Sequence, residues 1–252
     1  MRGLKGKAAI VTGAAQGIGK AIAERLSEEG ADVLWADIDE QRVQESQRAS
    51  GGGVSMKVDI SKESDVEHMV SIAVEVFGRL DILINNAARF VFATATDITD
   101  EDWDQVLGTN VRGTSFATKH AARAMVAAKT AGAIVNIAST SAFVAQPGFV
   151  PYSTSKGAIL QMTRVSALDL GKAGIRVNAL CPGPILTSGS ARHAASAGKT
   201  LEELCQEMTE PLIIKRMGQP SEVAAAAAFL ASEESSFITG TTVTIDGGLT
   251  AI

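Results

Sequence analysis

The sequence predicts an α/β fold in which a doubly wound parallel sheet carries helices on both of its faces. Short apolar runs of strand length alternate with helical patterns along most of the chain. A glycine-rich turn follows the first apolar run and opens a helical pattern. The 252 residues are 46% hydrophobic and contain no linker-like tract. We therefore expect one domain over residues 1–252.

The first elements are a strand over residues 7–11, the turn with Gly13, Gly17 and Gly19, and a helix that runs through Glu29. Glycines let a backbone approach a ligand closely, and the N–H groups at a helix N-terminus attract a pyrophosphate. The spacing Gly-x-x-x-Gly-x-Gly departs from the commoner Gly-x-Gly-x-x-Gly fingerprint of dinucleotide sites. Glycines also serve capping and close packing, so this motif alone leaves both interpretations open.

A second strand, residues 32–36, leads to Asp37 and Ile38. An acidic residue at this place can accept hydrogen bonds from an adenosine ribose and would repel a 2′-phosphate. The competing interpretation is that Asp37 caps the helix that begins near Asp39. The preceding glycine turn favours the ribose, and therefore NAD over NADP. Arg42, one turn into that helix, is the nearest residue that could reach a phosphate.

The alternation continues to the end of the chain. We expect strands over residues 53–58, 81–84, 133–138, 175–180 and 242–245, and helices over 62–77, 100–128, 155–172 and 221–231. Ligands bind at the carboxyl ends of parallel strands, where Asp59, Asn86 and Ser139 fall, although such residues also satisfy turns. Asn110 lies inside a predicted helix. Asparagine is a mediocre helix former, so it indicates a local distortion or a functional task.

Tyr152 is the only tyrosine of the chain and lies four residues before Lys156, at the predicted start of a helix. Residues four apart share a helix face. A neighbouring positive charge lowers the pKa of a phenol from its ordinary value of about 10, so this pair can form a general acid and base. Taken alone, the pattern is more typical of a packed ring and a solvated lysine. The other motifs decide between the two.

Together these motifs resemble those of the short-chain dehydrogenase/reductases. The matching residues are Thr12-Gly13-x-x-x-Gly17-Ile18-Gly19, Asn85-Asn86-Ala87, Asn110, Ser139, Tyr152-x-x-x-Lys156, Pro182-Gly183 and Asp246-Gly247-Gly248. They span nearly the whole chain in the family's order. Ala88 departs from the pattern, because many members have glycine there. We expect the change to be tolerated if the backbone φ angle of Ala88 is negative.

The resemblance implies a Rossmann fold and a role for each matching residue. Tyr152 would be the acid and base, and Lys156 would lower its pKa and hold the nicotinamide ribose. Ser139 would bind the substrate oxygen, and Asn110 would support a water-linked proton relay to Lys156. The implied cofactor site consists of Gly13, Gln16, Gly17, Ile18, Gly19, Asp37, Ile38, Asp59, Ile60, Asn86, Ala87, Tyr152, Lys156, Pro182, Gly183, Ile185 and Thr187. Candidates for the substrate pocket are Arg89, Ser141, Phe143, Gln146 and Phe149, with Phe90 and Phe92 beside them.

Residues 184–217 separate the sixth strand from the last helix, and a connection of this length predicts a substrate lid. Within it, residues 200–208 have helical character, and residues 188–198 are small and polar enough to be mobile. Arg192 and His193 could meet an anionic or hydroxylated substrate. Solvated lid charges are the interpretation that we favour.

Composition excludes several classes of function. The net charge of −5, without a clustered Lys/Arg block, argues against a nucleic-acid or anionic membrane surface. No apolar leader or membrane-length run is present, so we expect a soluble, cytoplasmic protein with a small-molecule partner. Cys181 and Cys205 provide no disulfide framework. His68, His120 and His193 show no ligand spacing, and we expect no metal.

The sequence thus predicts an NAD-dependent oxidoreductase that transfers a hydride between nicotinamide and a secondary alcohol or ketone. The substrate would be a small polyol, a sugar, a cyclic alcohol or a diol, and the resemblance implies a homotetramer. An NADPH-dependent 3-oxoacyl thioester reductase is the alternative, and Asp37 followed by Ile38 counts against it. A non-catalytic NAD-binding sensor is more remote, because it predicts the loss of a catalytic residue and all four are present.

Overall fold

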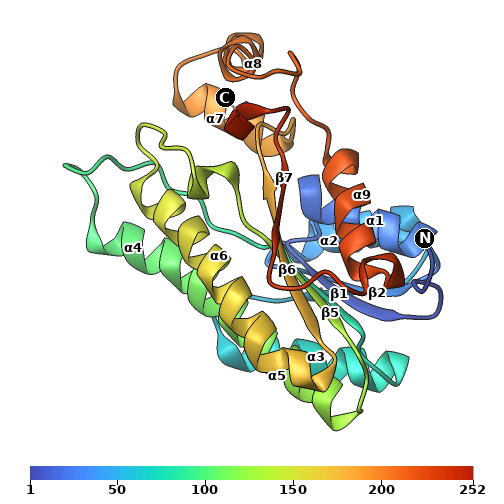
Figure 1. The fold of residues 1–252 in the computed structure, drawn as a ribbon. Helices are drawn as coiled ribbons and strands as arrows, with labels where there is room; N and C mark the ends of the chain where they lie inside the picture. Colours follow the sequence, from blue (N-terminus) through green and yellow to red (C-terminus); the bar gives the residue numbers. More distant parts are fainter. Residues whose placement is uncertain (252) are drawn as a thin grey trace.

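The computed structural model of the chain describes residues 1–251, with the side chains of Arg192 and Ser196 outside the description. The expectation for Arg192 therefore lies outside the described residues. The chain forms a seven-stranded sheet in the order β3-β2-β1-β4-β5-β6-β7, with helices on both faces (Figure 1). Each neighbouring pair of strands is parallel. The predicted doubly wound parallel sheet is confirmed.

The elements follow the predicted alternation closely. The strands are β1 (Ala8–Thr12), β2 (Asp32–Asp37), β3 (Val54–Lys57), β4 (Ile82–Asn85), β5 (Ala133–Ile137), β6 (Arg176–Pro182) and β7 (Thr242–Ile245). The α-helices are α1 (Gly17–Glu28), α2 (Glu40–Ser50), α3 (Glu63–Phe77), α4 (Asp100–Leu107), α5 (Thr114–Ala127), α6 (Val150–Leu170), α7 (Ser188–Ser196), α8 (Leu201–Thr209) and α9 (Pro220–Ala231). Within the described residues, no helix is long and apolar enough to span a membrane.

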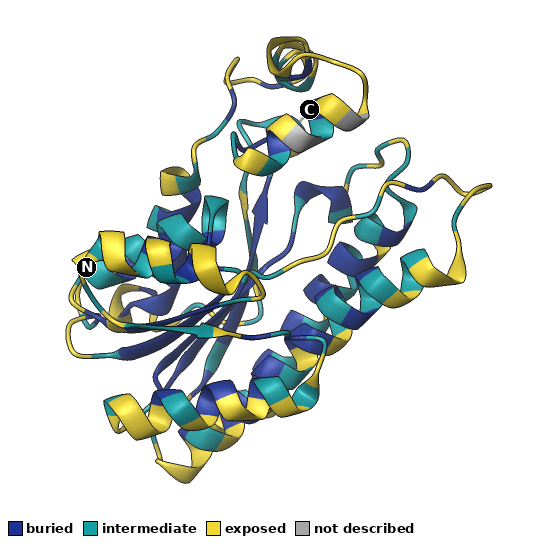
Figure 2. Ribbon diagram, turned by 180° about the vertical axis from the view of Figure 1, so that it is seen from behind, coloured by how far each residue is buried: buried dark blue, intermediate teal, exposed yellow. Residues whose placement is uncertain are grey.

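The core consists of two apolar layers, one on each face of the sheet. Val11 and Trp35 belong to the cluster that contains residues of α1 and α9. Their neighbours Ile10 and Leu34 belong to the cluster that contains residues of α3 and α5. Figure 2 shows the sheet buried between helices whose outer sides are exposed. Burial on both faces explains why the strands are continuous apolar runs in the sequence.

The predicted helix over residues 100–128 is interrupted, which is the first difference from expectation. A π-helical segment, Gly108–Gly113, separates α4 from α5. Asn110 lies in this segment and is 1% exposed. Its Oδ1 accepts a hydrogen bond from Arg89 N at 2.7 Å, and its Nδ2 donates to Arg89 O and to Ser155 Oγ, both at 2.9 Å. The expected local distortion at Asn110 is confirmed, and π-helical segments of this kind are frequent at functional sites.

The second difference from expectation lies in residues 188–198. The stretch predicted to be mobile contains the helix α7. Thr187 caps this helix through a reciprocal capping box with Ser190. Small polar residues suggested mobility, but Thr-x-x-Ser at this position supplies two of the hydrogen bonds that a helix N-terminus needs. The predicted helix over residues 200–208 is present as α8, capped by Thr200 and Glu203. Both helices lie beyond the carboxyl end of β6 (Figure 1).

A buried polar chain connects the sheet to α6 beneath these carboxyl ends. Asn85 Nδ2 donates to Asn136 Oδ1 at 2.8 Å, and Asn136 Nδ2 donates to Thr163 Oγ1 at 2.9 Å. Thr163 Oγ1 in turn donates to Ile159 O at 2.8 Å. Asn136 is fully buried and Thr163 is 1% exposed. The chain fixes the position of α6 relative to β4 and β5, because a buried donor left without a partner is costly.

We predict that Thr163→Val lowers the free energy of unfolding by about 1–3 kcal/mol, because it leaves Asn136 Nδ2 buried without its acceptor. Thr154→Val is the matched control, since Thr154 is exposed on the same helix. It should change the free energy by no more than about 0.5 kcal/mol. Guanidinium unfolding of both variants at one protein concentration measures the difference. Equal losses would show that the polar chain does not hold α6.

Candidate active site

The glycine turn after β1 is packed against the loop that follows β4. Gly13 has φ +67°, and a Cβ atom there would lie 2.8 Å from Asn86 Nδ2. A Cβ atom on Gly19 would overlap the carbonyl oxygen of Gly13. Asn86 Nδ2 donates to Thr12 O and Gly13 O, both at 3.0 Å. Only glycine fits at these two positions. The close packing places the N-terminus of α1 at the adjoining cavity.

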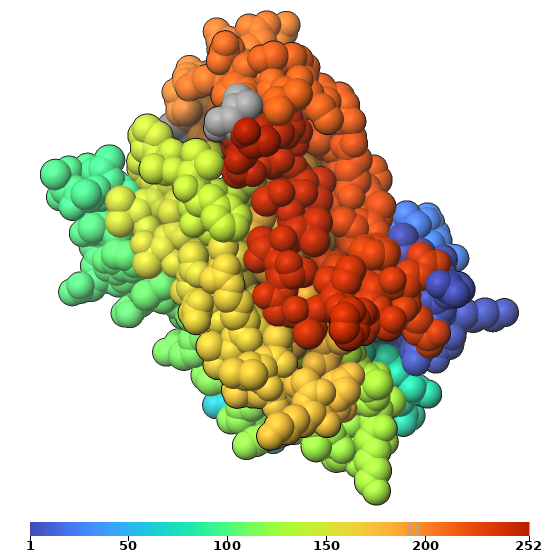
Figure 3. Space-filling model, in the orientation of Figure 1, coloured from blue at the N-terminus to red at the C-terminus, as the bar shows by residue number. Residues whose placement is uncertain are grey.

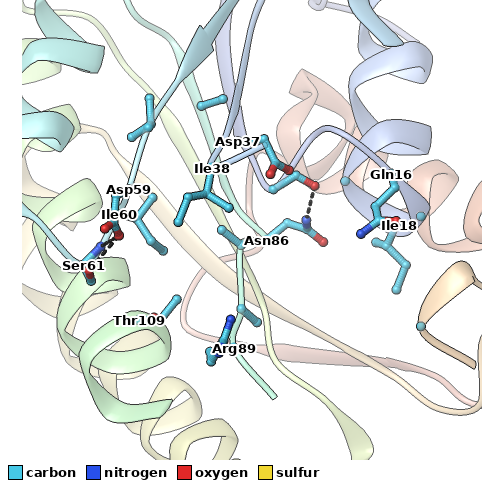
Figure 4. A pocket seen from close by; sticks show the side chains of 18 of the residues that line it. Gln16, Ile18, Asp37, Ile38, Asp59, Ile60, Ser61, Asn86, Arg89 and Thr109 are labelled. Atoms are coloured by element: carbon cyan, nitrogen blue, oxygen red, sulfur yellow. Dashed lines mark hydrogen bonds between the residues drawn. The ribbon is translucent and has the colours of Figure 1, made fainter. Parts of the chain in front are cut away.

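The first cavity, of about 600 Å³, lies over this turn at the ends of β2, β3 and β4. Figure 4 shows Gln16, Asp37 and Asp59 around it, each from a different segment. The predicted cofactor residues that line it are Gly13, Gln16, Gly17, Ile18, Gly19, Asp37, Ile38, Asp59, Ile60, Asn86, Ala87 and Thr187. Folding thus gathers these separate sequence motifs around one space.

Asp37 lines this cavity and does not cap α2. Its Oδ2 accepts a hydrogen bond from Ala15 N, and its Oδ1 accepts one from Asp39 N, both at 3.0 Å. The N-cap of α2 is Asp39, whose side chain accepts from Arg42 N at 3.1 Å. The alternative interpretation of Asp37 as the helix cap is therefore wrong. Arg42 Nη1 donates to Gln16 Oε1 at 2.7 Å, so this guanidinium is engaged at the rim of the cavity.

The second cavity, of about 700 Å³, continues from the first toward α6 and the segment 184–217. The two share six lining residues, namely Ile18, Asn86, Ala88, Arg89, Thr187 and Gly189. Ser139, Tyr152 and Lys156 line the second cavity, as do Pro182, Gly183 and Ile185. The two cavities form one trough that extends from Asp37 to Tyr152.

Tyr152 and Lys156 lie on one face of the first turns of α6, as their spacing predicts. Lys156 is 4% exposed, and its Nζ donates to Ile137 O at the end of β5, at 2.8 Å. The same Nζ lies 5.5 Å from the centre of the Tyr152 ring. Ser139 follows β5, and its Oγ donates to Ser141 Oγ at 3.1 Å. The three predicted catalytic side chains therefore meet at one end of the trough.

Burial dominates the electrostatics of this pair. It raises the pKa of Tyr152 to about 12, against the opposing effect of a hydrogen bond with Ser139. It also lowers the pKa of Lys156 to about 8. The sequence predicts the opposite direction for Tyr152, because a neighbouring ammonium favours a phenolate. In the structure, the ammonium lies over the ring and bonds to a carbonyl, and desolvation of the phenolate has the larger effect.

Asn110 lies behind the trough and does not line either cavity. It bonds to Ser155, the residue before Lys156, through the 2.9 Å contact described above. Ala88 lines both cavities. Between residues 1 and 251, Lys129 is the only residue other than glycine with positive φ, so Ala88 meets the condition for replacing the family's glycine.

Four of the five predicted pocket residues line the second cavity, namely Arg89, Ser141, Gln146 and Phe149. Phe143 does not, and it is 52% exposed. It follows the short 3₁₀ turn Thr140–Ala142, which leaves its ring outside the cavity. The prediction for Phe143 is therefore wrong. His193, the lid residue considered in the sequence, does line this cavity.

Sequence reasoning missed several lining residues from α7, α8 and the π-helical segment. They are Gly108, Thr109, Arg112, Ser188, Gly189, Ser190 and Met208. Ser188 Oγ donates to Gln16 Oε1 at 2.6 Å, so the beginning of α7 is tied to the glycine turn. The capping box of α7 was the one local signal that could have placed Ser188 and Ser190.

The trough fits a dinucleotide. Gly17, Ile18 and Gly19 bring the first turn of α1 to its wall, and the side chain of Gln16 at the N-cap accepts no hydrogen bond from that turn. Backbone N–H groups in this position suit a pyrophosphate. Asp37 supplies carboxylate oxygens that can accept from ribose hydroxyls. Within the described residues, no group of three or more His, Cys, Asp or Glu side chains could hold a metal ion.

Comparison with known proteins identifies the family. The family described as enoyl-(acyl carrier protein) reductase matches residues 13–250. Glucose 1-dehydrogenase 2 of Bacillus subtilis is 40% identical, with 98% of this chain and 96% of that protein covered. A short-chain dehydrogenase/reductase of Armillaria gallica is 38% identical, with coverages of 97% and 96%. The ligand-free structure of Thermoplasma acidophilum aldohexose dehydrogenase is 32% identical, has a TM-score of 0.90, and covers 99% of this chain and 96% of its own. The chain belongs to the short-chain dehydrogenase/reductase family and is an oxidoreductase.

Proposed function

We propose that the protein is an NAD-dependent oxidoreductase that transfers a hydride between nicotinamide and a secondary alcohol or ketone, mainly in the direction of alcohol oxidation. The observation that carries the proposal is the continuous trough with Asp37 at one end and Ser139, Tyr152 and Lys156 at the other. Residues 1–252 act as one catalytic domain, and residues 184–217 act as its substrate lid. Two of the relatives above are named as dehydrogenases of sugars, which supports the alcohol as substrate.

Each residue at the Tyr152 end has a task in this proposal. Bound NAD⁺ supplies the acceptor for the hydride that leaves the carbinol carbon, and the products are a ketone, NADH and one proton. Tyr152 takes the proton of the substrate hydroxyl, and Ser139 holds the substrate oxygen. Lys156 holds the nicotinamide ribose and favours the tyrosinate. Asn110 positions the turn before Lys156 and supports the proton relay.

At the other end of the trough, Asp37 accepts hydrogen bonds from the adenosine ribose. Asp59 and Ile60 would hold the adenine, and the glycine turn would hold the pyrophosphate. Ile185 and Thr187 hold the nicotinamide carboxamide in the proposal, and Pro182 and Gly183 complete its wall. The alternative is an NADPH-dependent 3-oxoacyl thioester reductase, whose substrate shares the acyl thioester but not the reacting C=C bond with the enoyl substrate in the name of the matching family. Asp37 followed by Ile38, without an arginine, favours NAD.

Tyr152→Phe should lower the turnover number for alcohol oxidation by at least about 10²- to 10⁴-fold, because it removes the oxygen that accepts the proton but keeps the ring. Formation of NADH with a secondary alcohol as substrate measures the change. Binding of NAD⁺, followed by calorimetry, should stay close to that of the wild type and serves as the control for folding. A variant that keeps most of its turnover would exclude Tyr152 as the acid and base.

The wild-type protein should bind NAD⁺ about a hundredfold or more tightly than NADP⁺, because the Asp37 carboxylate repels a 2′-phosphate. Asp37→Ala combined with Ile38→Arg should invert the preference, since it removes that charge and supplies a guanidinium for the phosphate. Calorimetric titration with both cofactors is the measurement. Asp39→Ala is the control, because it removes the cap of α2 and leaves the ribose site intact. Equal dissociation constants for the wild type would show that Asp37 does not select the cofactor.

Assembly as a homotetramer in the cytoplasm completes the proposal. Three large apolar side chains on two helices are between 48% and 80% exposed, which is unusual for such side chains. They are Val126 on α5 and Val165 and Leu168 on α6. Figure 3 shows α6 on the molecular surface beside the C-terminal segment. We expect light scattering to give the mass of a tetramer, and Leu168→Asp to give a smaller species. A monomeric wild-type protein at micromolar concentration would contradict this part of the proposal.

A further inference from the structure

The wall of the second cavity is built from aromatic rings, although the chain has few of them. The sequence contains 8 Phe, 2 Trp and 1 Tyr. Phe90, Phe92, Phe149 and Tyr152 all line this cavity. They come from two places, the loop after β4 and the beginning of α6. A concentration of rings at one cavity in a chain with 4% aromatic residues indicates a specific requirement there.

These rings contact one another and form a continuous apolar surface. The ring centres of Phe90 and Phe92 are 4.4 Å apart, and those of Phe90 and Phe149 are 5.0 Å apart. Phe90 also lies 4.5 Å from the ring of Tyr152, so the apolar surface reaches the proposed acid and base. Edge-to-face and tilted pairs of this kind are favourable and hold each ring in place. The part of the wall that these rings form is therefore apolar as far as Tyr152.

The segment 184–217 adds one more ring and a methionine to the lining of the cavity. The ring of His193 lies 4.7 Å from Phe92 and 6.0 Å from Phe149. Met208 from α8 also lines the cavity, and methionine adapts well to aromatic partners.

Several hydroxyl groups near the cavity are already engaged within the protein. Ser190 Oγ donates to Ile185 O at 3.0 Å and accepts from Thr187 N at 3.1 Å. Thr187 Oγ1 accepts from Gly189 N at 3.1 Å. A sugar or an open-chain polyol brings several hydroxyl groups that each need a partner when buried. The rings of Phe90, Phe92 and Phe149 offer no hydrogen-bond partner for them, so partners would have to come from the polar lining residues, which include Arg89, Ser141 and Gln146.

We propose that the substrate is a secondary alcohol or ketone whose reacting carbon belongs to, or is attached to, an apolar ring, and that aldoses and open-chain polyols are poor substrates. The inference rests on the proposed function and narrows it. The substrate oxygen binds between Ser139 and Tyr152, and the ring lies against Phe90, Phe92 and Phe149. Two of the relatives are named as dehydrogenases of sugars. The preference proposed for this chain differs from theirs.

The first test compares substrates with the wild-type protein. With NAD⁺, kcat/KM for 1-indanol should exceed that for D-glucose and for xylitol by at least about 100-fold, because the sugars leave buried hydroxyl groups unpaired. A value for either sugar that equals or exceeds the value for 1-indanol would overturn the inference and leave the proposed function standing. If the protein oxidises neither these three alcohols nor 2-propanol, the inference and the proposed function are both overturned.

The second test removes part of the wall without touching Tyr152. Phe92→Ala should lower kcat/KM for 1-indanol about tenfold or more, mainly through KM, because Phe92 contacts the ring and not the reacting carbon. The value for 2-propanol should stay within about twofold, since so small a substrate does not reach Phe92. Phe143→Ala is the matched control, because Phe143 is an exposed phenylalanine that lies outside the cavity, and it should change neither value. Equal losses for 1-indanol and 2-propanol, or no loss for either, would overturn the role of the aromatic wall.

Discussion

The active site depends on how the first turns of α6 are held against the carboxyl end of β5. Lys156 Nζ donates to Ile137 O, and Asn110 Nδ2 donates to Ser155 Oγ from the π-helical segment. These two contacts fix the rotation of α6, and that rotation decides where Tyr152 points. Below them, the chain of Asn85, Asn136 and Thr163 ties the same helix to two strands. The geometry of the site therefore depends on the placement of α6 more than on any single catalytic side chain.

This placement has an electrostatic cost, because burial opposes a charge on either member of the pair. It raises the pKa of Tyr152 and lowers the pKa of Lys156, so both groups are driven toward their neutral forms. Alcohol oxidation requires the opposite state at Tyr152. An oxidised nicotinamide ring carries a positive charge, which favours a tyrosinate close to it. In the proposed function, Lys156 and an oxidised nicotinamide ring would together supply the positive charge that favours a tyrosinate at Tyr152.

The sequence predicted the sheet and its order of elements from local patterns, whereas most residues of the trough were implied by the resemblance to the family. Alternating apolar runs predicted β1 to β7, and glycine spacing predicted the turn that only glycine can form. Three features could not be predicted in this way. The pKa of Tyr152 follows from burial, the exposure of Phe143 follows from a short 3₁₀ turn, and the contact of Ser188 with Gln16 joins α7 to the first turn of the chain. Asp37 shows the intermediate case, since the sequence left two interpretations and the capping of α2 by Asp39 excludes one of them, the helix cap.

The most direct test of the account is the ionisation of Tyr152 itself. The chain has one tyrosine, so the ultraviolet difference spectrum of tyrosinate reports this residue alone. After a rapid jump to pH 10, where an ordinary tyrosine is about half ionised, the protein without cofactor should show little tyrosinate, in line with its pKa of about 12. Saturating NAD⁺ should increase the tyrosinate signal, and Lys156→Met should reduce that increase. An identical signal with and without NAD⁺ would contradict the claim that the bound cofactor turns a buried phenol into a base.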